Sequence, residues 1–189
     1  VNSSSLYTGF RAAEIPASEI DKLYREHHLP ARPFGLLPNE FLVATAEGNP
    51  KQSVIARCRA DELLVPVDRA KTDSVWNVSP RNREQRMALD LLLDPAVKLV
   101  TLVGGAGTGK TLLALAAGMQ LVLNENLYDR ILVSRPIIPL GNDIGFLPGD
   151  KGAKLASWMQ PIFDNLDFLL GGEAERRAKS SSRYSTEGL

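Results

Sequence analysis

Apolar residues in the first part of the chain gather in short runs bounded by turn residues, which is the pattern of β-strands. Residues 41–44 and 53–56 are two such runs, and Glu-Gly-Asn-Pro at 47–50 is a strong turn signal between them. A third run covers residues 62–67, where Pro66 favours a strand at the edge of a sheet. The three runs predict a small sheet.

One short helix is predicted in the same part of the chain. Ser18 and Asp21 have the spacing of a capping box, and the apolar residues that follow fall on one helical face: Ile20, Leu23 and Tyr24. Together with the three strands, this helix predicts a small β-rich module over residues 1–75. No catalytic cluster is visible in its sequence.

The second part of the chain alternates helices and strands. Ser79 and Pro80, an N-cap followed by a proline at the first helical position, predict a helix over residues 81–93. Residues 98–103 are a β-rich apolar run, as a buried parallel strand requires, and the Leu- and Ala-rich residues 112–123 predict a helix.

A further strand is expected at residues 130–134. It completes a strand–helix–strand unit, whose strands should be parallel and whose crossover should be right-handed. Apolar residues between 155 and 169 then recur at helical spacing, and Pro161 is expected to kink or split that helix. Residues 173–189 are polar and lack apolar periodicity, which predicts a disordered tail.

The stretch between residues 103 and 112 carries the clearest chemistry. It matches G-x-x-x-x-G-K-[ST], the Walker A phosphate-binding loop, through these residues: Gly104, Gly105, Ala106, Gly107, Thr108, Gly109, Lys110 and Thr111. Glycines let the backbone N–H groups point at phosphates, and the helix that follows favours anions at its start. Lys110 is expected to reach the β and γ phosphates, and the Thr111 hydroxyl to bind Mg²⁺.

These patterns define the predicted fold class and domains. The fold class is α/β: a P-loop NTPase with an incomplete parallel sheet over residues 76–172, preceded by the small β-rich module. Lys110 and Thr111 are the predicted catalytic residues. A nucleoside triphosphate and Mg²⁺ are the predicted cofactors.

Composition adds little to this prediction. Lys plus Arg and Asp plus Glu number 22 each in 189 residues, so net charge gives no argument for nucleic acid or a membrane surface. The apolar stretches are too short or too interrupted to span a bilayer, so we expect no membrane partner. Cys58 is the single cysteine, which excludes an intramolecular disulfide and agrees with a cytoplasmic location.

One part of a P-loop site has no counterpart in the sequence. Such enzymes hold Mg²⁺ with the help of an aspartate at the end of a second strand, the Walker B motif. Between residues 135 and 189 no run of four apolar residues ends in Asp. Either this strand lies beyond residue 189, which we favour, or the fold is unusual. We therefore expect weak Mg·ATP binding and little turnover from this chain alone.

Several strings of residues resemble the PhoH-like ATPases. They are residues 103–111, Ile-Leu-Val-Ser-Arg-Pro at 131–136, Gly-Phe-Leu-Pro-Gly-Asp at 145–150 and Met-Gln-Pro-Ile-Phe-Asp at 159–164. Residues 37–41 and the junction at 76–81 are similar to the segment that joins a PIN nuclease domain to the ATPase in fused PhoH-like proteins. The resemblance implies an ATPase that processes or unwinds RNA, with ATP and RNA as partners and a ring-shaped homo-oligomer in the intact protein.

The resemblance also gives a role to Gln85. PhoH-like proteins are similar to superfamily 1 helicases, in which a glutamine upstream of Walker A reads adenine, and Gln85 occupies that place. A side-chain amide can donate to adenine and also accept from its amino group. From the residues alone, a solvated helix start is an equal alternative. With the resemblance we favour the adenine reading, and hence ATP over GTP.

Arg135 follows the predicted strand at 130–134, at the edge where open α/β sheets bind ligands. It is expected either to contact phosphate or nucleic acid, or to form a salt bridge nearby. Asp143 and Asp150 are expected to be solvated loop carboxylates, and Trp158 and Phe163 to be core residues.

Two other function classes stay open at this point. One is a P-loop kinase that acts on a small molecule. The other is a non-enzymatic RNA-binding or assembly module in which nucleotide has only a structural role.

Overall fold

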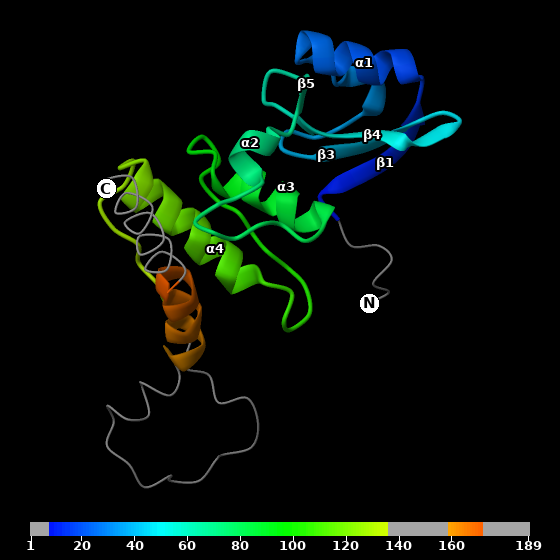
Figure 1. The fold of residues 1–189 in the computed structure, drawn as a ribbon. Helices are drawn as coiled ribbons and strands as arrows, with labels where there is room; N and C mark the ends of the chain where they lie inside the picture. The colour runs from blue at the N-terminus through cyan, green and yellow to red at the C-terminus, as the bar shows by residue number, and fades with distance from the viewer. Residues whose placement is uncertain (1–7, 136–158, 172–189) are drawn as a thin grey trace, which may run out of the picture. The chain divides into compact units, whose positions relative to one another are not determined.

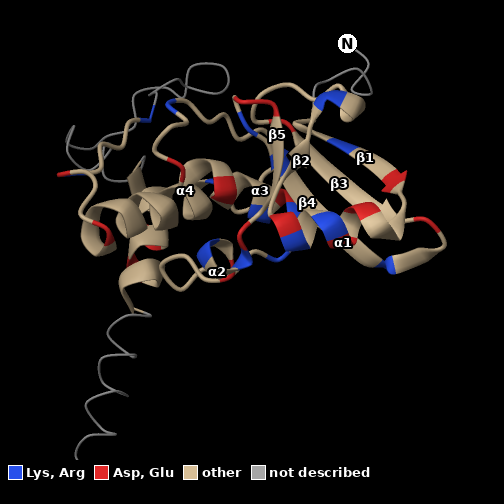
Figure 2. Ribbon diagram, turned by 90° about the horizontal axis from the view of Figure 1, so that it is seen from above, with Lys and Arg blue, Asp and Glu red and all other residues tan. Residues whose placement is uncertain are grey.

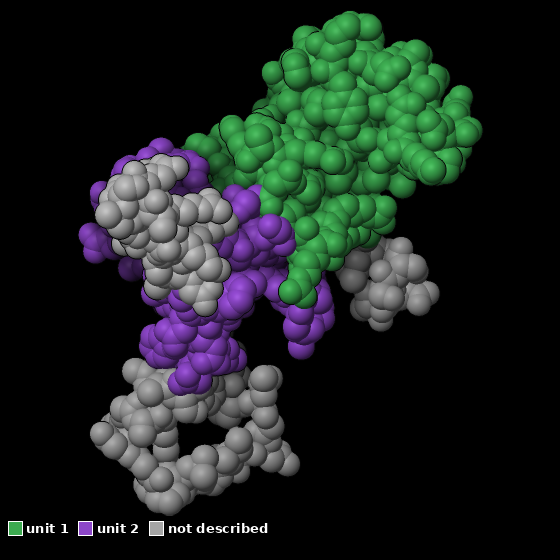
Figure 3. Space-filling view, viewed as in Figure 1, with its two compact units in different colours: residues 1–73, 80–100 green, residues 74–79, 101–189 purple. Residues whose placement is uncertain are grey.

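A computed structural model describes residues 8–135 and 159–171. The chain forms two compact units, one of residues 1–73 and 80–100 and the other of residues 74–79 and 101–189 (Figure 3). The first unit therefore includes the helix that precedes the glycine loop, which the sequence pattern groups with the ATPase part.

A five-stranded sheet forms the centre of the first unit. Its strands lie in the order β1 (Phe10–Ile15), β3 (Phe41–Ala46), β4 (Asn49–Cys58), β5 (Leu63–Pro66) and β2 (Leu29–Pro30). β1 runs parallel to β3, and the other three pairs are antiparallel. The predicted β-rich module and its three strands are confirmed, and so is the mixed α/β class. The edge position predicted for the third strand is wrong, since β5 lies between β4 and β2. The sheet also contains β1 and β2, which the apolar pattern did not indicate.

Helices cover both faces of this sheet (Figure 1). α1 (Ala17–Glu26) packs through Ile20 and Leu23 on the face that carries the even-numbered core residues of β3 and β4, such as Leu42 and Val54. α3 (Arg83–Leu92) packs through Met87 near Phe41 on the opposite face. The alternation of side chains along each strand therefore fills two separate cores.

Two shorter helices complete the first unit, η2 (Arg32–Phe34) and α2 (Arg69–Thr72). Basic and acidic residues lie side by side on α1 (Figure 2), in keeping with the equal numbers of the two charges in the chain. Among residues 8–135 and 159–171, no helix is long and apolar enough to cross a membrane.

Both predicted helix starts in this unit are wrong in detail. α1 begins at Ala17 after Pro16, with no side-chain cap, so Ser18 does not form the expected capping box. Pro16 has φ −54°, which already matches the helical value and makes it a suitable residue to precede the first turn. α3 is capped by Asn82 rather than Ser79, since the Asn82 Oδ1 accepts a hydrogen bond from the Gln85 N–H at 2.8 Å.

A buried ion cluster joins β4 to the end of α3. The Arg57 side chain is 2% exposed, and its Nε lies 3.2 Å from the Asp90 carboxylate. Its Nη2 contacts Asp94, which also lies 2.6 Å from the Arg59 Nη1. Two cations and two carboxylates balance in charge. The Arg57 Nε and Asp90 are close enough for an ion pair, but they lack the alignment of a hydrogen bond.

The second unit contains α4 (Lys110–Met119), continued by the π-helical turn η3 (Gln120–Asn124), and residues 159–171 are helical. Neither of the strands predicted at 98–103 and 130–134 is formed. Their apolar side chains are exposed: Leu99 by 84%, Val103 by 89% and Leu132 by 86%. A strand is held by hydrogen bonds to neighbouring strands, and within the described ranges these two segments have none.

Candidate nucleotide-binding site

The glycine loop runs directly into α4. Gly107 and Gly109 have φ of 74° and 83°, a left-handed conformation that glycine adopts without strain, and Gly109 is the N-cap of the helix. The first intrahelical hydrogen bond runs from the Leu113 N–H to the Gly109 oxygen at 2.9 Å. The N–H groups of the preceding helical residues, including Lys110 and Thr111, therefore have no acceptor within the helix and are suited to bind an anion.

The Lys110 ammonium lies over the loop. Its Nζ donates to the Gly104 oxygen at 2.9 Å, to the Gly105 oxygen at 2.7 Å and to the Thr108 Oγ1 at 3.2 Å. The Thr108 hydroxyl in turn donates to the Gly105 oxygen at 3.0 Å. The sequence pattern placed Thr108 in the loop but did not predict that its side chain contacts Lys110 and Gly105. A hydroxyl residue two positions before the lysine is the sequence signal for this contact.

Thr111 is exposed in the first turn of α4, so its hydroxyl is accessible. A hydroxyl next to phosphate oxygens is a suitable ligand for Mg²⁺, which usually keeps several waters. Within the described ranges there is no group of three His, Cys, Asp or Glu side chains that could hold a metal.

The far end of α4 packs closely against the segment that follows it. A side chain at Gly118 would place its Cβ 3.2 Å from the Ile131 Cδ1, which is tighter than ordinary van der Waals contact. Five further residues of α4 are buried: Leu113, Leu115, Ala116, Ala117 and Met119. The helix behind the loop is thus anchored, although the predicted strand at 130–134 is not formed.

Gln85 lies in the first turn of α3, in the other unit. Its Oε1 accepts from the Arg81 N–H at 2.7 Å, while its own N–H donates to Asn82. The side chain thus takes part in the start of the helix.

The other residues from the sequence are placed as follows. Arg135 is exposed at the end of the described range, and no strand precedes it. Asp143, Asp150 and Trp158 lie outside the described residues. Phe163 is 45% exposed, so it is not the core residue that its spacing predicts, whereas Ile162 and Leu169 of the same helix are buried.

Comparison with known proteins identifies the family. The model of the PhoH-like protein family matches residues 77–185. The chain belongs to the PhoH-like family. No solved structure matches it.

Among the relatives is Protein PhoH2 of Bacillus subtilis, 39% identical over 178 residues, which cover 92% of this chain and 40% of that protein. Protein PhoH2 of Mycolicibacterium smegmatis is 34% identical over 164 residues, which cover 86% of the chain and 37% of that protein. Protein PhoH of Escherichia coli is 38% identical over 74 residues, covering 39% of the chain and 21% of that protein. The chain thus spans about 40% of the length of the first of these relatives.

The PhoH2 alignments are longer than the region that the family model matches, so they include much of the sheet module. Membership of this family makes the chain a P-loop nucleotide-binding protein of ATPase type, as its Walker A residues predict.

Proposed function

We propose that the glycine loop of this chain binds Mg·ATP and that the intact protein hydrolyses it. The position of the Lys110 Nζ carries this proposal, because the ammonium lies within hydrogen-bonding distance of three oxygens of the loop. Phosphate oxygens bind an ammonium in the same way and are stronger acceptors, because they are charged. A bound triphosphate would take over part of these contacts.

The chain's own residues then stabilise the reacting phosphate. Lys110 neutralises charge that develops on the γ phosphate, and the N–H groups from Gly105 to Thr111 hold the phosphate chain. Thr111 would hold Mg²⁺, which would supply further charge neutralisation. A positioned water would attack the γ phosphorus in line, as the bond to the β,γ-bridging oxygen breaks and ADP leaves.

Gln85 and Arg135 are the residues proposed to refine this site. The Gln85 amide would accept from the adenine amino group and donate to the adjacent ring nitrogen, which favours ATP over GTP. Arg135 would contact phosphate or nucleic acid. The similarity of PhoH-like proteins to superfamily 1 helicases supports the role of Gln85, and the place of Arg135 after residues 130–134 supports the second role. The resemblance to PhoH-like ATPases supports a coupling of ATP hydrolysis to RNA processing or unwinding by a ring-shaped oligomer.

A titration with a fluorescent ATP analogue in Mg²⁺ tests the site. Lys110→Ala should weaken binding by more than about tenfold, since it removes a charge-assisted contact worth roughly 1.5–3 kcal/mol. Lys98→Ala is the matched control, because Lys98 donates to the Pro95 oxygen rather than to the loop. Equal binding by Lys110→Ala and the unchanged chain would exclude the proposed site.

Two further measurements test the finer parts of the proposal. Gln85→Ala should reduce the preference for ATP over GTP by about tenfold, the effect of one or two lost hydrogen bonds. An unchanged preference would exclude the adenine role. ATP hydrolysis by the intact protein, measured with and without single-stranded RNA, tests the coupling to RNA.

A further inference from the structure

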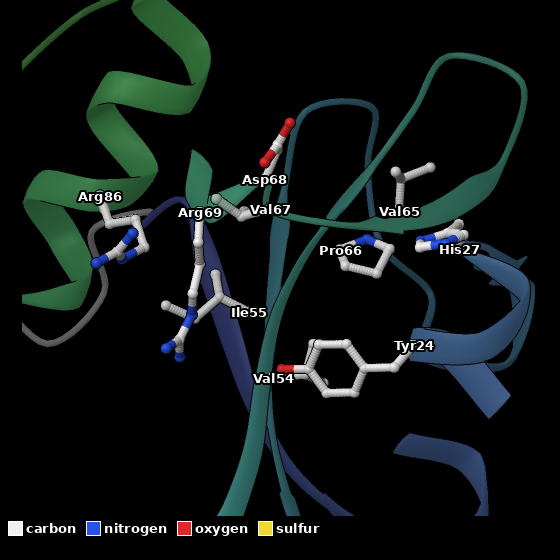
Figure 4. A pocket seen from close by; sticks show the side chains of 10 residues that line it. All are labelled: Tyr24, His27, Val54, Ile55, Val65, Pro66, Val67, Asp68, Arg69 and Arg86. Atoms are coloured by element: carbon white, nitrogen blue, oxygen red, sulfur yellow. The ribbon is translucent and has the colours of Figure 1, made fainter. Parts of the chain in front are cut away.

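The first unit contains a pocket that is independent of the glycine loop. Its volume is about 490 Å³, within the range of roughly 300–1,000 Å³ that is usual for small-ligand sites. α1, β4, β5 and the starts of α2 and α3 contribute its lining (Figure 4). All lining residues belong to one unit, so the pocket is a property of the sheet module and α3.

One side of the pocket presents a flat aromatic ring. Tyr24 is 47% exposed, and its hydroxyl donates to the Ser53 oxygen at 3.1 Å, so the far end of the ring is fixed. Val54, Pro66 and His27 also line the pocket (Figure 4). A fixed ring with apolar neighbours is the surface on which nucleobases stack.

The other side carries two guanidinium groups, of Arg69 and Arg86 (Figure 4). Arg86 is held in place, since its Nη1 donates to the Thr72 Oγ1 at 2.9 Å and to the Asp73 carboxylate at 2.6 Å. Arg69 differs, because it has no ion-pair partner in the described parts of the chain.

The carboxylate nearest in sequence does not neutralise Arg69. The Asp68 Oδ1 accepts from the Ala70 N–H at 2.9 Å and so caps α2. The five donors of the Arg69 guanidinium are thus suited to a bound anion, and a planar guanidinium matches the geometry of a phosphate group.

We propose that this pocket binds a nucleotide unit, with its base against Tyr24 and its phosphate on Arg69. An aromatic surface opposite an unpaired guanidinium is the combination by which proteins bind nucleotides without reading their sequence. The same chemistry is offered by a free nucleotide and by one residue of a single-stranded RNA. The proposal does not depend on ATP binding by the glycine loop.

The test uses the chain with Lys110→Ala, in which binding to the glycine loop is weakened, so that binding at the pocket is measured apart from the proposed ATPase function. The probes are uridine 5′-monophosphate and a labelled oligouridylate of about ten nucleotides, within the ~4–16 nucleotides that single-stranded sites cover. Binding is measured by fluorescence anisotropy, directly for the oligonucleotide and by competition for the mononucleotide. Circular dichroism confirms that each variant folds.

Arg69→Ala and Tyr24→Ala should each weaken binding by about tenfold, as expected for loss of a charge-assisted contact or of one stacked base. Two matched controls should change it by less than about twofold. Lys71→Ala removes the same charge from α2 at a residue outside the pocket, and Tyr24→Phe keeps the ring but loses the bond to Ser53.

The two probes distinguish the sources of the nucleotide. Tight binding of the oligonucleotide with weak competition by the mononucleotide assigns the pocket to RNA, and equal binding of both assigns it to a free nucleotide. If neither probe binds, or if Lys71→Ala weakens binding as much as Arg69→Ala does, the proposal is wrong. Should Tyr24→Ala fail to fold, the comparison of Arg69→Ala with Lys71→Ala decides the matter.

Discussion

The sheet module and the segments that flank the glycine loop are both rich in apolar residues, but they differ in burial. Leu42 in β3 is 1% exposed, whereas Val103 and Leu132 are 89% and 86% exposed. Each strand of the module has a hydrogen-bonded neighbour, and the two flanking segments have none in the part of the chain that is described. Loop and helix form from local contacts, whereas a strand needs its neighbours. This explains why the glycine loop and α4 form without the strands predicted on either side.

The largest expected effect concerns the ion cluster in the module. Arg57→Ala should lower the free energy of unfolding by about 3–5 kcal/mol, because it leaves the Asp90 carboxylate, whose side chain is only 15% exposed, without its cation. Urea denaturation followed by circular dichroism measures this change. Arg32→Ala is the control: the Arg32–Glu62 pair is largely exposed, so its loss should cost less than about 1 kcal/mol. Similar losses from both variants would contradict the role given to burial.

A matched pair of leucines compares the two regions directly. Leu23→Ala should cost about 2–5 kcal/mol, since Leu23 is fully buried between α1 and the sheet. Leu132→Ala removes the same atoms from an exposed position and should change the free energy of unfolding by less than about 0.5 kcal/mol. Thermal or urea unfolding of the two variants gives the answer. A large loss of unfolding free energy in Leu132→Ala would mean that residues 130–134 are buried in solution. The difference in burial between the sheet module and these residues would then be wrong.

Acid unfolding tests the carboxylates that surround Arg57. Burial alone raises the pKa of Asp94, but hydrogen bonds from the Ala96 N–H and from Arg57 hold that pKa below its ordinary value of 3.8. A lowered pKa contributes stability above the pKa of the unfolded chain, and this contribution disappears as the pH falls from about 5 to about 2. Asp94→Asn should therefore flatten the loss of stability over that range.

Asp90 should have the opposite effect. Burial raises its pKa above 3.8, against the lowering effect of Arg57. The folded chain therefore takes up a proton more readily than the unfolded chain, and stability gains as the pH falls through the raised pKa. Asp90→Asn removes this gain, so the free energy of unfolding should fall more steeply as the pH is lowered. Urea midpoints between about pH 7 and pH 3 report both slopes, and identical slopes for the two variants would contradict the assignment.

The features predicted correctly from the sequence are those that a few neighbouring residues determine. The glycine loop, α4, the hairpin of β3 and β4 and the strand β5 all follow from local patterns. The edge position that Pro66 suggested for β5 is wrong, because β5 pairs with β4 on one side and with β2 on the other. β1 could not be found in this way, because Phe10–Ile15 contains two alanines, an arginine and a glutamate and is held by its parallel pairing with β3. The strands at 98–103 and 130–134 were predicted from short runs of apolar residues. Such a run does not provide the hydrogen-bonded neighbouring strands that a strand requires.

The candidate site shows the same limit. Lys110 and the loop glycines could be named from their spacing. In the structure Lys110 contacts Gly104 and Gly105, which lie only six and five residues before it in the sequence. The pocket at Tyr24 and Arg69 could not be found from sequence, because its lining comes from five separated elements. Asn82 was missed as the cap of α3 because Ser79 and Pro80 match the usual helix start more closely.

The smallest expected effect lies within the loop and compares two glycines that differ only in backbone conformation. A Cβ at either Gly105 or Gly107 would meet no atom within 4 Å, but Gly107 has φ 74°, a conformation that costs an alanine about 1 kcal/mol. Gly107→Ala should therefore weaken binding of Mg·ATP by about fivefold, and Gly105→Ala by less than about twofold. Titration with the fluorescent ATP analogue measures both. If Gly105→Ala weakens binding of Mg·ATP as much as Gly107→Ala does, the close approach of phosphate to the loop, rather than the loop's own conformation, determines the affinity. The loop would then be formed less completely by local contacts than α4.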